Sequence, residues 1–410
     1  MDSFIFIGSN EAQAKLIQLL VKRVLKELDS TPLDVAPYTV GLESRIEKLM
    51  SLLDVRSNGV RVLGLHGMGG VGKTTLAKAL YNKLVGSFEC LVFMKNDREN
   101  SETDDDLVYL QNKLINHLSP GKPPVYRIDS GISAIKAMVH EKQVLVILDD
   151  ICNVRQLEVL VGRDWFSEGS RIIITTRDSE VLPEHLVNEF YEVIELAPAE
   201  ALQLFSYHAL RREKPTERFM NLSKKMVSLT GGLPLALEVF GSFLFERWRI
   251  EEWKDALQKL ERIRSRNLQD VLKISYDGLD VQEQCIFLDL ACLFIKKEIE
   301  REDILDALKG FGFRAEIAVT ILRARSLIKV FEDNSLWMHD QIRDMGRQIV
   351  LDESPVNPGK RSRLWDRDEI MTVLKAKKVR PIVRYLISSS FFSCSFSVAL
   401  QVQNFSKRQI

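Results

Sequence analysis

Short apolar runs alternate with longer amphipathic segments along residues 40–196 of the chain. In the longer segments apolar positions recur at helical spacing, which predicts helices over residues 74–85, 107–118 and 133–142. The short runs are apolar on both faces, as strands of a parallel sheet are when helices cover both sides. They predict strands over residues 60–65, 90–95, 144–150, 171–177 and 191–196. This part of the chain is therefore predicted to be an α/β domain.

After residue 197 the strand pattern stops and helical spacing takes over. Helices are predicted over residues 198–212, 216–230, 233–248 and 251–262, and three or more further helices between residues 268 and 350. Residues 326–339 interrupt that second group, and their two short apolar runs around a turn at Glu332–Asn334 predict a β-hairpin. Helices followed by a small hairpin favour a winged-helix fold.

Both ends of the chain differ from this middle. Residues 11–28 form an amphipathic pattern, which we interpret as a packing helix rather than a membrane or partner helix. Residues 30–39 contain two prolines and turn formers and predict a linker. We expect an N-terminal helix and linker over residues 1–36, the α/β domain over 37–196, a helical domain over 197–266, a winged-helix domain over 267–378 and an irregular tail over 379–410.

Charge and cysteine content narrow the class of protein. Lys plus Arg and Asp plus Glu both total 57, so the net charge is zero and coating of nucleic acid or acidic lipid is disfavoured. The 5 cysteines contain no C-x-x-C pair, which predicts buried thiols in a reducing compartment. The N-terminus has no basic region of a secretion signal, and residues 385–400 carry 6 serines, too many for a spanning helix. We expect a cytoplasmic protein, with the nucleus as a second compartment.

A complete phosphate-binding loop follows the first predicted strand. Gly67-x-x-x-x-Gly72-Lys73-Thr74 matches G-x-x-x-x-G-K-[ST], with a strand before it and a helix after it, as the motif requires. Its glycines let backbone N–H groups point at phosphate oxygens, and the helix N-terminus adds a positive dipole end. Lys73 is predicted to reach the β- and γ-phosphates, and the Thr74 hydroxyl to bind Mg²⁺. The candidate phosphate-binding residues are Gly67, Gly69, Gly70, Val71, Gly72, Lys73, Thr74 and Thr75.

Two acidic residues end the apolar run over 144–150. Asp149 is predicted to hold Mg²⁺ through a water molecule. Asp150 stands where vigorous ATPases with this strand order carry a glutamate that activates the attacking water. Since aspartate is one methylene shorter, it positions that water less well. Lys73, Asp149, Asp150 and Arg177 are the candidate catalytic residues.

Arg177 ends the buried run over 171–177. If that strand inserts between the strands over 60–65 and 144–150, its end lies close to the γ-phosphate. Arg177 would then sense whether this phosphate is present. The alternative is a structural cap on the end of a strand.

Six motifs occur in an order that resembles one family. GMGGVGKTTLAKALYN, LVILDDI, GSRIIITTRD, GGLPLALEVFGSFL, CIFLDLACLF and MHD follow one another as in plant nucleotide-binding leucine-rich-repeat resistance proteins. The resemblance covers roughly residues 37–350 and concerns the NB-ARC module, of the same signalling-ATPase class as animal apoptosome scaffolds. Residues 40–45 and 287–294 resemble the branch with an N-terminal TIR domain. Cys152 stands where that branch usually has aspartate and the coiled-coil branch has tryptophan.

The resemblance implies an α/β P-loop NTPase domain with a parallel sheet, an all-α helical domain and a winged-helix domain, and it assigns further contacts. Val40 and Gly41 would contact the adenine, and Pro234 would pack near the adenine or sugar. His339 would reach the β-phosphate of ADP from the winged helix, and Asp340 would help to lock the domains closed. A donor on a separate domain makes ADP binding and closure stabilise each other. The implied cofactors are ADP or ATP and Mg²⁺.

Family features outside residues 37–350 do not appear in the sequence. No leucine-rich repeat pattern occurs, and the residues before the linker leave no room for a TIR fold. We therefore expect no NADase activity and at most slow ATP hydrolysis. We interpret residues 379–410 as the tail of a truncated product or of a gene model that runs into non-coding sequence.

Three functional hypotheses follow. The first is an ADP/ATP switch in plant defence signalling, with other immune-receptor or guarded host proteins as partners and self-association in the ATP state. The second is an ATPase whose winged helix binds DNA, because residues 323–329 are locally basic. The third is a truncated adaptor or decoy that pairs with a full-length relative. We expect no direct binding to nucleic acid or membrane under the first hypothesis.

Overall fold

The computed structural model describes residues 32–95, 103–261, 268–294, 301–310, 312–331 and 333–375. The helix predicted over residues 11–28 and the tail predicted over 379–410 lie outside these residues. The chain divides into two compact units, Met1–Glu195 and Leu196–Ile410, each with its own architecture.

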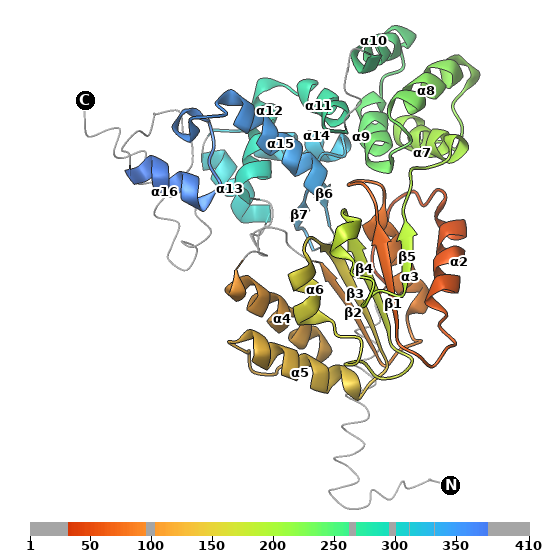
Figure 1. Cartoon of the computed structure of the whole chain (residues 1–410). Coiled ribbons are helices and arrows are strands. Elements are labelled where there is room, and N and C mark those ends of the chain that lie inside the picture. Colours follow the sequence, from red (N-terminus) through yellow and green to blue (C-terminus); the bar gives the residue numbers. More distant parts are fainter. Residues whose placement is uncertain are drawn as a thin grey trace, which may run out of the picture. The chain divides into compact units, whose positions relative to one another are not determined.

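The first unit is built on a five-stranded parallel sheet (Figure 1). Its strands run in the order β2-β3-β4-β1-β5, and every neighbouring pair is parallel. β4 therefore lies between β1 and β3, so the carboxyl ends of these three strands meet at one edge of the sheet. The strands are β1 (Arg61–His66), β2 (Cys90–Lys95), β3 (Val144–Ile151), β4 (Arg171–Thr176) and β5 (Glu189–Glu192).

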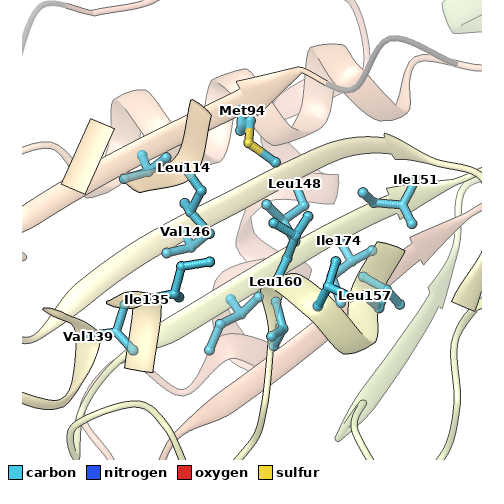
Figure 2. Packing of buried hydrophobic residues seen from close by; sticks show 14 of the residues in the cluster. Met94, Leu114, Ile135, Val139, Val146, Leu148, Ile151, Leu157, Leu160 and Ile174 are labelled. Atoms are coloured by element: carbon cyan, nitrogen blue, oxygen red, sulfur yellow. The ribbon is translucent and has the colours of Figure 1, made fainter. Parts of the chain in front are cut away.

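Helices cover this sheet and bury its apolar faces. They are α2 (Leu42–Leu53), α3 (Lys73–Leu84), α4 (Asp104–Leu118), α5 (Ile128–His140) and α6 (Val154–Leu160). Every residue of β3 is buried, as its uninterrupted apolar run predicts. One apolar cluster joins β2, β3 and β4 to α4, α5 and α6, and Figure 2 shows Leu114, Ile135 and Leu160 facing Val146 and Leu148 within it.

A buried arginine fixes the loop between α2 and β1. The Arg171 side chain is fully buried, and its Nε donates to Leu53 O at 2.7 Å while Nη1 donates to Gly59 O at 2.8 Å. Nη2 donates to Asp54 O and Ser57 O. The guanidinium thus donates to several carbonyls along this loop at once and holds the loop against β4.

The strand predicted over residues 191–196 is wrong in its position. β5 covers Glu189–Glu192 and pairs with Leu63–His66 of β1. β1 ends at His66, where the phosphate-binding loop begins, so the ladder has no partner strand beyond that point. Val193 N still donates to His66 O at 2.8 Å, and the chain then leaves the sheet.

The second unit begins with four helices. They are α7 (Pro198–Leu210), α8 (Glu217–Leu229), α9 (Pro234–Leu244) and α10 (Ile250–Glu261), each close to its predicted range. Trp253 is fully buried, with its ring centroid 6.0 Å from that of Phe205 and 4.5 Å from that of Phe219. These aromatic contacts join α7, α8 and α10 into one core.

More helices and one hairpin complete the second unit, as the sequence predicts. The helices are α11 (Leu268–Asp277), α12 (Val281–Asp289), α13 (Arg301–Gly310), α14 (Ala315–Ala324), α15 (Asp340–Glu353) and α16 (Arg367–Lys375). β6 (Lys329–Val330) and β7 (Leu336–Trp337) pair antiparallel between α14 and α15 (Figure 1). A buried ion pair, with 2.6 Å between Arg363 Nε and Asp289 Oδ1, ties the segment before α16 to α12.

Of the described cysteines, only Cys292 is buried. Cys90, Cys152 and Cys285 are half-buried, which corrects the prediction of buried thiols for these three. Burial raises the pKa of the Cys292 thiol to about 12. Within the described ranges, no helix combines the length and apolar character that crossing a membrane requires.

Candidate functional site

The phosphate-binding loop joins the end of β1 to the start of α3. Gly67, Gly70 and Gly72 have φ of 143°, 82° and 103°, in the region that residues with a Cβ rarely adopt. A Cβ on Gly67 would lie 2.5 Å from Val193 O. The loop conformation therefore requires glycine at these positions, and Gly67 also needs it because another backbone segment passes so closely.

Lys73 lies at the first position of α3, and its side chain folds back over the loop. Its Nζ donates to Gly67 O at 2.6 Å and to Met68 O at 2.8 Å, and the residue is buried. The ammonium is thus held across the loop at the positive end of the α3 dipole. This places the charge where a phosphate chain would bind, as the motif predicts.

Asp149 is the centre of a hydroxyl network at the carboxyl edge of the sheet. Thr74 Oγ1 donates to its carboxylate at 2.9 and 3.0 Å, and Thr175 Oγ1 donates to Oδ1 at 2.7 Å. Burial raises the pKa of Asp149, while the hydrogen bonds from both threonines act in the opposite direction. The structure thus brings together the two predicted Mg²⁺ ligands, Thr74 and Asp149.

Asp150 and Arg177 form an ion pair beside this network. Arg177 Nε lies 3.5 Å from Asp150 Oδ1, and both side chains are largely buried. Asp150 has φ of 62°, a region that aspartate tolerates better than most residues, and its N–H donates to Thr175 Oγ1 at 2.8 Å. The register against β4 is irregular between Leu148 and Ile151, so β3 bulges where its two acids project.

The other predicted nucleotide contacts of the first unit lie before α2, within the phosphate-binding loop and in the first turn of α3. Val40 and Gly41 precede α2, where Gly41 has φ of 69° at the N-cap position. Val71 is buried within the loop, and its N–H donates to Met68 O. Gly69 and Thr75 complete the loop and the first turn of α3. Their roles as nucleotide contacts stay predictions.

Pro234 and His339 belong to the second unit. Pro234 is the first residue of α9. Proline is favoured at this position because a backbone N–H there would have no partner within the helix. His339 is the N-cap of α15, and its Nδ1 accepts from Gln341 N at 3.1 Å. Asp340 pairs with buried Arg343 in the same helix, with 2.8 Å between Oδ1 and Nη1. The predicted contacts of Pro234 and His339 with nucleotide, and the locking role of Asp340, stay predictions.

Two residues of this region were not predicted from the sequence. The Thr175 hydroxyl donates to the Asp149 carboxylate and accepts from the backbone N–H of Asp150. The polar pair Thr175–Thr176 at the end of an apolar run was the available signal. Arg45 donates from Nη1 to Ile194 O and from Nη2 to Glu195 O, both at 2.9 Å. Because its partners are backbone carbonyls 149 and 150 residues away, no sequence pattern points to them.

The residues present suit a nucleotide phosphate chain with Mg²⁺. Among the described residues, no group of three or more His, Cys, Asp or Glu side chains gathers as a metal site. Mg²⁺ needs no such group, because it binds through one or two carboxylates, substrate phosphates and water. Thr74 and Asp149 would supply the protein part of that set, and the glycine loop and Lys73 would hold the phosphates.

The sheet order and this site define a P-loop nucleotide-binding domain. Residues 42–215 match the NB-ARC domain, and residues 280–354 match the winged-helix domain described as "Disease resistance protein Roq1-like". The chain therefore carries the NB-ARC and winged-helix domains of plant disease resistance proteins, as the order of motifs predicts.

Individual relatives cover most of this chain. "TMV resistance protein N" of Nicotiana glutinosa is 39% identical over an alignment of 373 residues that covers 89% of this chain and 32% of that protein. "Disease resistance protein RPV1" of Vitis rotundifolia is 38% identical over 367 residues, 89% of this chain and 26% of that protein. The chain thus spans a third or less of the length of these curated relatives.

One solved structure is similar over a comparable part of the chain. It is a signal transduction ATPase with numerous domains and a tetratricopeptide repeat sensor, from Pyrococcus horikoshii. The TM-score is 0.49 at 16% identity, over 87% of this chain and 47% of that one.

Proposed function

We propose that this chain is an ADP/ATP-binding switch of plant defence signalling, bound to ADP at rest and to ATP when active. The observation that carries the proposal is the Arg177–Asp150 ion pair beside the Thr74–Asp149–Thr175 network. A γ-phosphate near this edge would compete with Asp150 for the guanidinium. ADP leaves the ion pair in place and ATP breaks it, so the site reports which nucleotide is bound.

The same ion pair supports slow hydrolysis rather than fast turnover. Asp150 is shorter than the glutamate expected of a vigorous ATPase, and its carboxylate is engaged with Arg177. A general base must lie within hydrogen-bond reach of the attacking water. When bound, Mg²⁺ would be held by Thr74 and Asp149 and would neutralise phosphate charge. Hydrolysis then resets the switch.

The cap at α15 fixes how His339 can act. Because Nδ1 accepts a hydrogen bond from Gln341 N, the proton of the neutral ring is on Nε2. We propose that this N–H donates to the β-phosphate of ADP, with Pro234 near the adenine or sugar. The second unit would make such a contact only when ADP is bound. ADP would therefore stabilise the closed conformation, and the closed conformation would raise the affinity for ADP.

The nucleotide content of the purified chain tests the proposal. The wild-type chain should release ADP on denaturation, as measured by chromatography of the supernatant. Lys73→Arg should abolish this ADP, whereas Lys83→Arg, an exposed lysine on the same helix, should keep it. His339→Ala should shift the content towards ATP. Absence of any bound nucleotide together with absence of micromolar affinity would overturn the switch.

The contacts of the basic segment over residues 323–329 argue against the DNA-binding hypothesis. Arg325 Nη1 donates to Ser275 O, and its guanidinium lies over the Phe243 ring. Lys329 Nζ lies 3.2 Å from Glu238 Oε1. Two of the three basic residues over 323–329 thus contribute to the fold of the second unit. A salt-dependent DNA titration checks this, because phosphate contacts lose affinity steeply with salt.

The finer predictions complete the proposal. We propose the domain boundaries predicted above within the two observed units, a cytoplasmic location with the nucleus as a second compartment, and self-association in the ATP state. The proposed partners are other immune receptors or guarded host proteins. Pairing of this chain with a longer relative is compatible with the switch.

A further inference from the structure

The loop between α4 and α5 carries a Pro-Pro-x-Tyr sequence on the surface. Residues 119–127 read SPGKPPVYR, and residues 122–126 belong to neither helix nor strand (Figure 1). The two prolines fix their own φ near −65°, and the residue before each proline is pushed towards extended backbone. The prolines therefore favour, over residues 122–124, an extended backbone that is suited to polyproline II geometry.

The side chains of this segment divide between the core and the solvent. Pro123, Pro124 and Tyr126 are exposed, and the Tyr126 side chain keeps 83% of its surface accessible. Val125 instead packs against the apolar cluster under α4 and α5. In a helix with three residues per turn, positions 123 and 126 share one edge, while position 125 points elsewhere. The domain thus buries only the third residue and presents the other three.

Asn112 of α4 holds this presentation in place. Val125 N donates to Asn112 Oδ1 at 2.7 Å, and Asn112 Nδ2 donates to Val125 O at 2.8 Å. These bonds use both backbone polar groups of Val125 within the domain. They also order the segment before any partner arrives, which lowers the entropy cost of binding.

We propose that Pro123–Tyr126 is a docking ligand for a WW-type domain of a partner protein. Such domains recognise proline-rich extended segments in grooves lined by aromatic rings. The exposed proline and tyrosine rings supply contacts to a groove of this kind without any rearrangement of the chain. Lys122 and Arg127 flank the segment, so a partner groove with acidic residues at its rim would be favoured.

A groove that reads Pro-x-x-P fits this loop less well. Pro120 and Pro123 have that spacing, but Gly121 between them has φ of 85°, outside polyproline II geometry. Lys122 N also donates to Ser119 O in a turn. The segment without turn, helix or strand therefore starts after Gly121, so it includes the whole Pro-Pro-x-Tyr sequence and only one proline of the Pro-x-x-P pair.

Calorimetric titration of the full chain with a recombinant WW domain that binds Pro-Pro-x-Tyr peptides tests the proposal. Saturable binding with one domain per chain is expected. Tyr126→Ala and Pro123→Ala should each weaken it by about tenfold or more, as loss of a main contact does. Pro120→Ala and Tyr109→Ala, at an exposed tyrosine of α4, should leave it unchanged.

A synthetic peptide of residues 119–130 separates the motif from its presentation. The chain should bind at least as tightly as the peptide, and Asn112→Ala should weaken binding of the chain several-fold. Failure of the chain to saturate while the peptide binds would overturn the proposal, because the segment would then be covered. Equal affinity of wild type and Tyr126→Ala, at unchanged melting temperature and nucleotide content, would also overturn it, and so would loss of binding in Pro120→Ala.

Discussion

Asp149 shows at the scale of one residue how the site keeps a buried carboxylate. Its charge is removed from water, which raises its pKa, and the Thr74 and Thr175 hydroxyls stabilise the ionised form. A cation beside the Asp149 carboxylate would stabilise its ionised form more strongly than the two hydroxyls do. The hydroxyls therefore hold the carboxylate in the position from which it would bind Mg²⁺ under the proposed function.

Thr175→Val tests this arrangement at nearly constant side-chain volume. The variant removes a 2.7 Å donor to Asp149 and the acceptor for Asp150 N, so both buried groups lose a partner. We expect a loss of about 1–3 kcal/mol in the free energy of unfolding of the first unit, together with weaker Mg²⁺-dependent nucleotide affinity. Urea unfolding and a nucleotide titration at several Mg²⁺ concentrations measure the two effects.

Thr176→Val is the matched control for this experiment. The Thr176 hydroxyl bonds to the backbone of Asp178 rather than to either acid of β3. The Thr176→Val variant should change the free energy of unfolding but leave the Mg²⁺ dependence of nucleotide binding as in the wild type. An identical Mg²⁺ dependence in Thr175→Val would show that Thr175 has only a structural role.

At the scale of elements, the segment after β5 contacts both the start of the phosphate-binding loop and α2. Val193 N donates to His66 O, and Val193 O lies where a Cβ on Gly67 would have to be. The next two carbonyls accept from Arg45 of α2. The segment over residues 193–195 is thus packed against the phosphate-binding loop immediately before the second unit begins at Leu196.

Arg45→Gln should loosen this segment. Loss of two charged donors from partly exposed carbonyls should cost about 1 kcal/mol of unfolding free energy and release ADP several-fold faster, since the start of the loop loses support. Stopped-flow release of a fluorescent ADP measures the rate. Arg56→Gln, at an exposed arginine in the next loop, should match the wild type. Unchanged release from Arg45→Gln would contradict the support role.

His208 makes α7 sensitive to acid. Burial lowers its pKa to about 4, against 6.5 for an unperturbed histidine, and Glu238 only partly offsets this. Between these pH values the unfolded chain binds a proton that the folded chain does not. Folding stability therefore falls as pH decreases from about 6.5 to about 4, and this contribution levels off below that range.

His208→Gln should remove this pH dependence. We expect the wild-type second unit to lose about 1 kcal/mol of unfolding free energy per pH unit more than the variant in that window. Urea unfolding followed by tryptophan fluorescence at pH 7 and pH 5 measures the difference. Equal slopes in the two proteins would mean that His208 titrates normally in the folded state.

Sequence patterns predicted elements better than contacts. Strands such as β3 were readable because both of their faces are buried, and the phosphate-binding loop because its glycines and lysine follow a fixed spacing. β5 was misplaced because its end depends on where β1 stops pairing. Thr175 and Arg45 depend on register and on distant backbone carbonyls, which no local pattern encodes.

At the scale of the whole molecule, the predicted nucleotide contacts are divided between two units. The phosphate-binding loop, Asp149 and Arg177 belong to the first unit, and Pro234 and His339 belong to the second. Each unit is compact by itself. A nucleotide that contacts both would couple them, and that coupling would act equally in both directions.

Hydrogen exchange of the full chain tests this coupling directly. If His339 Nε2 donates to the β-phosphate, ADP should slow amide exchange at the start of α15 (Asp340–Glu353) as well as around Lys73. ATP with Mg²⁺ should protect the loop around Lys73 and leave α15 as in the nucleotide-free chain. His339→Asp keeps a side-chain acceptor for Gln341 N at the N-cap but has no N–H donor, so ADP should then protect the loop alone. Protection of α15 by ADP that survives this substitution would rule out His339 as the contact, and absence of any ADP effect on the second unit would confine the switch to the first.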